Sequence, residues 1–166
     1  MTGNCSVDPR AYSEHKLVPP APLPHVSRHA LRRVKDWMPP PTCCPYCDGP
    51  VRLVVNSEIY RGRAYGDWPY AYLCRPCDAF VGLHPETDLP LGTLANRELR
   101  EARKVAKRLW SMVASAERMD RTQAYAWLAK RMRIPPAECH FGHFNLQRAA
   151  LAFNICDLHL SQGSNP

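Results

Sequence analysis

Apolar and polar positions alternate in short stretches near the middle of the chain. In residues 51–55 the odd-numbered positions are Val, Leu and Val. This period of two predicts a half-buried β-strand, because successive side chains of a strand point to opposite faces. Two more strands are expected over residues 68–72 and 79–83. The aromatic residues of the first of these share one face: Trp68, Tyr70 and Tyr72. That face is either a core or a platform on which bases stack.

The last part of the chain has the three-to-four-residue period of helices. A helix is predicted from Asn96, a candidate cap, with apolar residues recurring on one face. Asp120 and Gln123 form the capping-box pattern of a second helix, which a proline pair ends. Asn145 is positioned to cap a third helix that runs towards Leu160. This helix is apolar almost all round, so we expect it to fill the core.

Residues 1–42 follow neither pattern. They hold eight of the 17 prolines, and the runs 19–24 and 39–41 are typical of polyproline II. The segment is therefore predicted to be a mostly disordered tail. Between the two runs, Ser27 could cap a short basic helix that reaches Trp37. That helix is either a transient turn in a linker or a docking peptide for a protein or a nucleic acid.

Two Cys-x-x-Cys steps flank the predicted strands, with 26 residues between them. Two residues between ligands let one tight turn present both sulfurs to the same ion, and four thiolates complete the shell of a structural zinc. The alternatives are two disulfides or a redox pair. Disulfides need an oxidising compartment, and the first residues lack the apolar segment of a secretory signal. The spacing predicts one structural Zn²⁺ held by Cys44, Cys47, Cys74 and Cys77.

Other residues near these steps allow further interpretations. Cys43 could replace Cys44 as a ligand, although a two-residue loop is the commoner knuckle. Asp48 and Asp78 stand where a glycine usually follows a knuckle. His84 is expected to pack or to form hydrogen bonds, because four sulfurs already close the site. One more group of residues has two interpretations: it forms a second metal site, or its members are ordinary buried and surface residues. The group is Cys139, His143, Cys156 and His159.

The net charge of +7 is distributed unevenly. Residues 1–42 carry +3, residues 43–92 carry −2 and residues 93–166 carry +6. Six basic residues cover much of the first long helix and are the predicted contacts to DNA or RNA phosphates: Arg97, Arg100, Arg103, Lys104, Lys107 and Arg108. No apolar run approaches the ~20 residues of a membrane span, so we expect a soluble protein with no membrane partner.

Several runs around the two knuckles point to a known family. They cover residues 65–73, 81–85, 90–95, 124–129 and 138–142. With these runs the chain from 43 to about 145 resembles the zinc-finger-containing family of unknown function found in phages and prophages. The resemblance implies a zinc ribbon followed by helices, with the four cysteines of the knuckles as zinc ligands. It also implies a phage or prophage accessory protein in the host cytoplasm.

These patterns predict an α+β protein: a disordered tail over 1–42, a zinc ribbon over 43–92 and a helical region over 93–166 packed on the ribbon. No catalytic constellation stands out, and a zinc closed by four cysteines has no open position for water. We therefore expect a non-enzymatic protein that binds nucleic acid, or a nucleic-acid-processing complex, through the basic helix. The alternatives are an adaptor for a host or phage protein and a metal-dependent nuclease-like hydrolase, the latter suggested by His84, Glu86 and Asp88.

Overall fold

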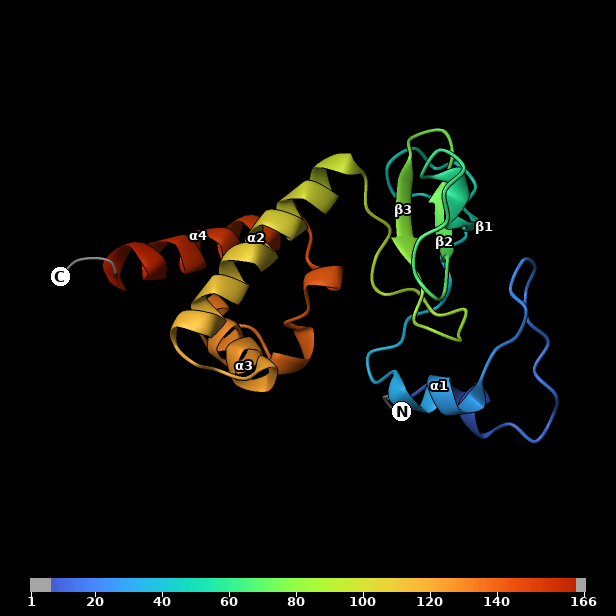
Figure 1. The fold of residues 1–166 in the computed structure, drawn as a ribbon, viewed down its shortest axis with the longest axis horizontal. Coiled ribbons are helices and arrows are strands. Elements are labelled where there is room, and N and C mark those ends of the chain that lie inside the picture. The colour runs from blue at the N-terminus through green and yellow to red at the C-terminus, as the bar shows by residue number, and fades with distance from the viewer. Residues whose placement is uncertain (1–6, 164–166) are drawn as a thin grey trace. The chain divides into compact units, whose positions relative to one another are not determined.

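The computed structural model describes residues 7–163 and has the predicted α+β class (Figure 1). The chain divides into two compact units, residues 1–96 and residues 97–166. The first unit contains the short helix α1 and three strands, and the second contains three longer helices. Their bounds are α1 Arg28–Arg33, β1 Arg52–Val55, β2 Tyr70–Cys74, β3 Ala79–Gly82, α2 Arg97–Ala116, α3 Arg121–Met132 and α4 Leu146–Gly163. Within residues 7–163, no helix combines the length and the apolar character that crossing a bilayer requires.

The three strands form one antiparallel sheet in the order β1-β2-β3. Tyr72 is paired with Leu53 on one side and with Val81 on the other, so these side chains share a face. Together with Trp68 and Tyr70 they belong to the apolar core of the ribbon. The aromatic face predicted from the sequence is therefore a core surface rather than an open stacking platform.

The prediction of a disordered tail is wrong for residues 7–42. Val7, Ala11, Leu31 and Val34 are buried together with Leu89, which lies beyond the sheet. Leu23 is buried in the ribbon core itself. The prolines do not prevent this packing, because the segment needs few backbone donors and contributes mainly apolar side chains. The segment and the ribbon thus form one folded unit.

Helix α1 is part of that packing. Ser27 caps it as expected, with its Oγ accepting from the N–H of Ala30 at 3.3 Å. The helix ends at Arg33, earlier than the sequence pattern suggests, and Leu31 is fully buried. Neither a transient linker turn nor a free docking peptide describes it, because its apolar face is already covered within its own unit.

A buried ion-pair cluster fastens the start of this segment to the loop that follows β3. The Arg10 guanidinium donates to both carboxylate oxygens of Asp88, each at 2.8 Å, and to Asp8 at 2.7 Å. The two carboxylates are buried, with 2% of Asp8 and 4% of Asp88 exposed. Hydrogen bonds to Asp88 and then Asp8 raise the pKa of Arg10 above its already high ordinary value. Arg10 is therefore the counter-charge of two buried acids.

The second unit is a three-helix core around Trp110, Leu128 and Phe144. The predicted capping box of α3 is present: Asp120 accepts from the N–H of Gln123 at 2.8 Å, and Gln123 accepts in return at 2.9 Å. Asn145 caps α4 by accepting from Arg148 N–H at 2.9 Å.

Helix α4 is less buried than its composition suggests. One side, with Ala149, Ala152 and Cys156, is fully buried, whereas Leu151 and Leu158 are exposed. Its small residues pack closely against α2, so the large apolar residues of the other side do not all enter the core.

Replacing Arg10 by Ala should destabilise the first unit, because two buried carboxylates lose their cation. The expected loss is about 2 to 4 kcal/mol, less than for a fully buried pair, because 40% of the Arg10 side chain is exposed and solvent screens its charge. Arg10→Lys should retain part of the stability, since the charge stays but the forked geometry is lost. Urea unfolding measures both. Lys16→Ala, an exposed change in the same segment, is the control. Equal stability of the Arg10→Ala variant and the wild type would contradict the structural role of the cluster.

Candidate metal centre

The four cysteines of the two knuckles lie at one end of the antiparallel strand pair β1–β2. Cys44 and Cys47 lie in the turn before β1, Cys74 is the last residue of β2, and Cys77 lies in the turn between β2 and β3. Each turn is tight because only two residues separate its sulfurs. In the first, Asp48 N–H donates to the carbonyl of Cys44 at 2.9 Å. The antiparallel pairing of β1 with β2 brings the two turns to one end of the ribbon.

An aspartate completes each knuckle. Asp48 and Asp78 have φ of +55° and +54°, in the left-handed region. Glycine is the usual residue there, but Asp enters this region more readily than most side chains. The replacement of glycine by Asp thus leaves the knuckle geometry intact, and the two turns share the same left-handed backbone conformation at this position.

The distances between the sulfurs fit a tetrahedral zinc. Neighbouring Sγ atoms are 3.3 Å apart for Cys44 and Cys77, 3.4 Å for Cys47 and Cys74, and 3.5 Å for Cys74 and Cys77. A Zn–S bond of about 2.3 Å gives about 3.8 Å between sulfurs in a regular tetrahedron, whereas a disulfide requires about 2.05 Å. The donor set therefore has the size and the chemistry of a structural zinc site and not of two disulfides.

The environment of the sulfurs is asymmetric. Cys44 and Cys74 are fully buried, Cys77 is half-buried and Cys47 is exposed. Burial, together with the neighbouring thiols, raises the pKa of Cys74 to about 12, and burial also raises the pKa of Cys77. For Cys44 burial acts in the same direction, but hydrogen bonds from Tyr46, Cys77, Cys74 and Cys47 outweigh it and lower its pKa to about 7. Zinc must therefore displace protons when it binds.

Gly49 has a steric role at the centre. A Cβ on this residue would lie 3.2 Å from Sγ of Cys47 and 3.5 Å from Sγ of Cys74. The backbone after the first knuckle consequently passes close to the sulfurs, where a larger residue would press on Sγ of Cys47. A zinc coordinated by all four cysteines has a closed shell, so its chemistry is structural: it joins the two turns and offers no position for a reacting water.

The residues that compete for a metal role lie elsewhere. Cys43 is exposed, and its thiol donates to the carbonyl of Asp48 at 3.4 Å, outside the four-sulfur cluster. Cys44 is therefore the ligand. Of the remaining candidates, Cys139 and Cys156 are buried, with pKa values that burial raises to about 11. His159 instead pairs with Glu117 at 2.8 Å.

The acidic residues that suggested a hydrolase contact the N-terminal segment. Asp88 is bound by Arg10, and Glu86 lies 3.8 Å from Arg33 and 3.9 Å from His25. In the described part of the chain, His84 belongs to no group of metal-ligating atoms. Its backbone closes the loop instead, with its N–H donating to Leu89 at 2.9 Å.

The six predicted phosphate contacts all lie on α2, but they differ in exposure. Four are exposed: Arg97, Lys104, Lys107 and Arg108. Arg100 and Arg103 are half-buried. Arg103 has a structural contact, because its Nε donates to the carbonyl of Phe144 at 2.8 Å and so holds the chain just before α4.

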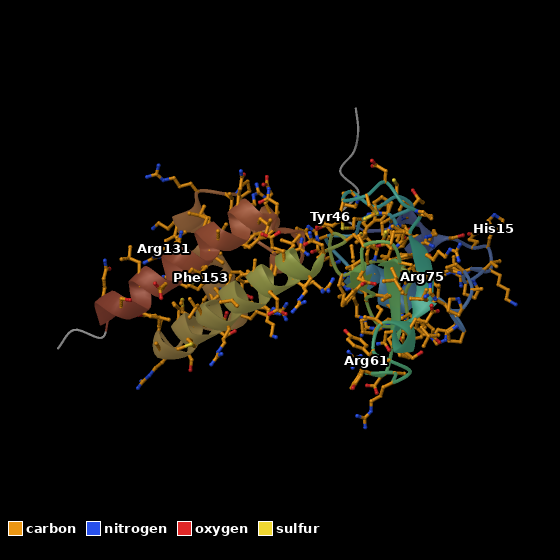
Figure 2. The ribbon with its side chains drawn as sticks, turned by 90° about the horizontal axis from the view of Figure 1, so that it is seen from above. His15, Tyr46, Arg61, Arg75, Arg131 and Phe153 are labelled. Carbon is orange, nitrogen blue, oxygen red and sulfur yellow. The ribbon has the colours of Figure 1, made fainter. Side chains whose placement is uncertain are left out.

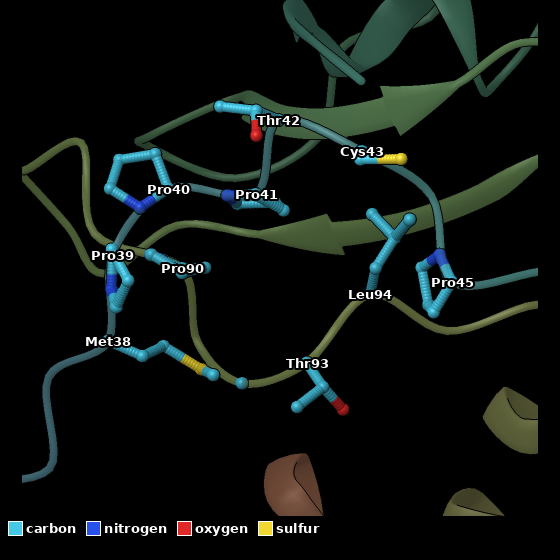
Figure 3. Close-up of a pocket in the computed structure, with 11 residues that line it drawn as sticks. Met38, Pro39, Pro40, Pro41, Thr42, Cys43, Pro45, Pro90, Thr93 and Leu94 are labelled. Atoms are coloured by element: carbon cyan, nitrogen blue, oxygen red, sulfur yellow. The ribbon is translucent and has the colours of Figure 1, made fainter. Parts of the chain in front are cut away.

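Two features of the first unit escape the sequence patterns. One is a pocket of about 380 Å³ between residues 38–45 and 90–94, with five prolines among its eleven lining residues and Leu94 and Cys43 at one end (Figure 3). The other is the loop between β1 and β2, which carries exposed Tyr60 and Tyr65. The pocket depends on two segments distant in sequence. The loop had a signal in its mixture of arginine, tyrosine and glycine.

Cys74→Ser should remove the zinc and unfold most of the ribbon, because the three short strands bury too little apolar area to fold without the metal. Elemental analysis is expected to give one zinc per chain for the wild type and for Cys43→Ser, and much less for Cys74→Ser. The loss of zinc in Cys74→Ser should be accompanied by loss of the β-strand signal in far-ultraviolet circular dichroism. A wild-type protein free of zinc, or a ribbon that stays folded in excess chelator, would refute the assignment.

The comparisons with known proteins agree with this centre. A family model described as a zinc-finger-containing domain matches residues 40–157. No curated protein and no solved structure matched significantly. The family model gives no origin, so the phage or prophage setting stays a prediction. Because the match spans most of the sequence and includes all four ligands of the structural zinc, the chain belongs to this family of zinc-finger-containing domains.

Proposed function

We propose that the protein is a non-enzymatic nucleic-acid-binding module, in which the zinc ribbon accompanies a helical unit that contacts phosphates through α2. The observation that supports the proposal is how the charge is arranged on this helix. At about 100° per residue, five basic residues fall within roughly 100° of arc. They are Arg97, Arg100, Lys104, Lys107 and Arg108, and we call them the α2 basic stripe.

The stripe lies opposite the side of α2 that is buried. Leu99, Ala106, Trp110 and Val113 form the buried side, and all members of the stripe except the half-buried Arg100 are exposed. From Arg97 to Arg108 the stripe extends about 16 Å along the helix axis, at 1.5 Å per residue. That length spans about five successive base pairs of duplex DNA. One acidic residue, Glu101, lies beside it and is 3.7 Å from Lys104.

Phosphate binding through such a stripe has a measurable signature. Each Lys or Arg that meets a phosphate releases condensed counterions, so affinity falls steeply as salt rises. Contacts to phosphates carry no sequence information, so binding through the stripe is expected to be largely independent of sequence.

The triple change Lys104→Glu, Lys107→Glu and Arg108→Glu should weaken binding to duplex DNA and flatten the log–log salt slope by about two to three units. These three residues are exposed, so the helix should fold normally. Fluorescence anisotropy with a labelled duplex over a salt series measures the slope.

A matched control separates the stripe from net charge. Lys16, Lys35 and Lys130 are exposed lysines outside α2, and their change to Glu alters the net charge by the same amount. That control variant should keep most of the wild-type slope. Absence of wild-type binding at low salt, or an equal loss in both triple variants, would refute a phosphate contact by α2.

A second candidate function is that of an adaptor for a protein partner. The proline-lined pocket supports it, because an apolar pocket of about 380 Å³ accepts one or two apolar side chains of a peptide. Its lining includes Pro40, which is exposed, and Pro90. This role does not require nucleic acid.

Pro40→Glu should abolish capture of a protein partner if the pocket binds it, because a charge would enter an apolar site. Pro20→Glu, an exposed proline of the same segment outside the pocket, is the control. Affinity capture from host cells, with and without nuclease, distinguishes the two functions. A partner that is retained after nuclease and lost only with Pro40→Glu supports the adaptor. Loss of every partner with nuclease contradicts it.

A further inference from the structure

The loop between β1 and β2 is long but held by hydrogen bonds. The Asn56 side chain binds the backbone of Tyr65 twice: its Nδ2 donates to the carbonyl at 2.9 Å and its Oδ1 accepts from the N–H at 3.1 Å. Within the loop, Gly62 N–H donates to Ser57 at 2.8 Å and Arg63 N–H donates to Tyr60 at 3.2 Å. The loop therefore presents its side chains from a closed frame.

Two tyrosines of this frame form an exposed aromatic pair. The rings of Tyr60 and Tyr65 are 5.1 Å apart at 83°, edge to face. Phe80 of β3 supports Tyr60 from the sheet, with centroids 6.2 Å apart. Even so, 41% of Tyr60 and 51% of Tyr65 remain exposed. The pair is held by its neighbours without being covered by them.

Two arginines of the same loop, Arg61 and Arg63, lie next to the pair in sequence. The Arg63 guanidinium lies 5.9 Å from the centroid of the Tyr65 ring. Arg61 is exposed, and in Figure 2 it extends into solvent at the tip of the loop. No ion pair of Arg61 occurs among the described residues. Glu58, the acidic residue nearest in the loop, is already paired with Arg75.

The backbone at the tip points Arg61 outwards at some conformational cost. Arg61 and Gly62 are both in the left-handed region, with φ of +54° and +89°. Few arginines adopt that conformation, so the loop is not shaped by the preference of this residue. Tyr60, Arg61, Arg63 and Tyr65 together are called the Arg-Tyr loop below.

We propose that the Arg-Tyr loop is a stacking site for single-stranded nucleic acid. An exposed ring offers its face to an unpaired base, and the neighbouring guanidinium groups bind the phosphates on either side. Duplex bases are already stacked and cannot use the rings. The proposal rests on the proposed nucleic-acid binding, but it concerns another surface and another form of the ligand than the α2 basic stripe.

An acidic peptide is the competing ligand for such a loop. Its carboxylates would pair with Arg61 and Arg63, but they would gain little from the faces of the tyrosine rings. The contribution of the rings therefore distinguishes the two ligands.

The test measures binding of labelled oligothymidine of about 20 nucleotides by anisotropy, since one loop contacts only part of such a strand. Tyr60→Ala with Tyr65→Ala should weaken binding by about ten-fold for each base that stacks, without changing the salt slope. Tyr60→Phe with Tyr65→Phe should bind like the wild type, because stacking needs the ring and not the hydroxyl. Tyr12→Ala removes a tyrosine that is 65% exposed outside the loop and serves as the control.

A second pair of variants tests the charges. Arg61→Gln with Arg63→Gln should flatten the salt slope for oligothymidine by about one to two units, at roughly 0.7 per phosphate contact. Because Tyr60 packs against Phe80, zinc content and circular dichroism are measured for every variant, and Tyr65→Ala alone gives a readout with the Phe80 contact intact.

The outcomes separate this proposal from the proposed function. Oligothymidine binding that is unchanged in Tyr65→Ala and in the double Ala variant, both with full zinc content, overturns the stacking site, whatever α2 does. Loss of duplex binding in the α2 triple variant alone supports the proposed function only. Loss of oligothymidine binding in the tyrosine variants alone supports the stacking site only. Stronger binding to polyglutamate than to oligothymidine, insensitive to the rings, overturns it in favour of an acidic protein.

Discussion

The zinc coordination is the constraint on which the first unit depends. Three strands of four or five residues cannot bury enough apolar surface to fold alone. The four sulfurs replace that missing surface with a local cross-link, which joins the turn before β1 to the turn after β2. Both knuckles reach this geometry in the same way, with two residues between the sulfurs and an aspartate in the left-handed region. Once the end of β2 and the start of β1 are fixed, they determine the register of the two strands and the positions of the two ends of the loop between them.

The N-terminal segment supplies what the zinc does not. A sheet has two faces, and a metal bound at one end of a small sheet covers neither face from solvent. Leu23 enters the ribbon core, and Leu31 with Val34 covers Leu89 beyond β3. Arg10 is shared by two buried carboxylates, Asp8 of its own segment and Asp88 of the ribbon range, so the charge of Asp88 is partly compensated from outside the ribbon's own sequence range. The acidic ribbon and the basic tail of the sequence are thus complementary parts of one unit.

The sequence was most informative where the physics is local. Spacing alone predicts the zinc ligands, and caps such as Asp120 with Gln123 and Asn145 mark helix starts, because both depend on residues a few positions apart. The packing of residues 7–42 could not be predicted in this way, since proline content describes the backbone and says nothing about a distant apolar partner such as Leu89. Of the two interpretations of the aromatic pattern, the core is confirmed: Tyr70 and Tyr72 alternate and belong to the ribbon core, whereas the exposed rings lie in the irregular loop that has no period. The exposed side of α4 was missed because small and large apolar residues contribute equally to a hydrophobic pattern but not to close packing.

The bond between Arg10 and Asp88 also determines the order in which the unit can assemble. These residues are 78 positions apart, whereas the sulfurs of Cys44 and Cys77 are 33 apart. Closing the longer loop costs more chain entropy, and the Arg10–Asp88 ion pair stabilises the unit only when the loop after β3, which carries Asp88, is already formed. During synthesis the N-terminal segment leaves the ribosome first, yet its counter-ion is made about eighty residues later. Loop length and the order of synthesis thus both favour late docking of the part of the unit that is translated first, on a ribbon that the metal has already closed.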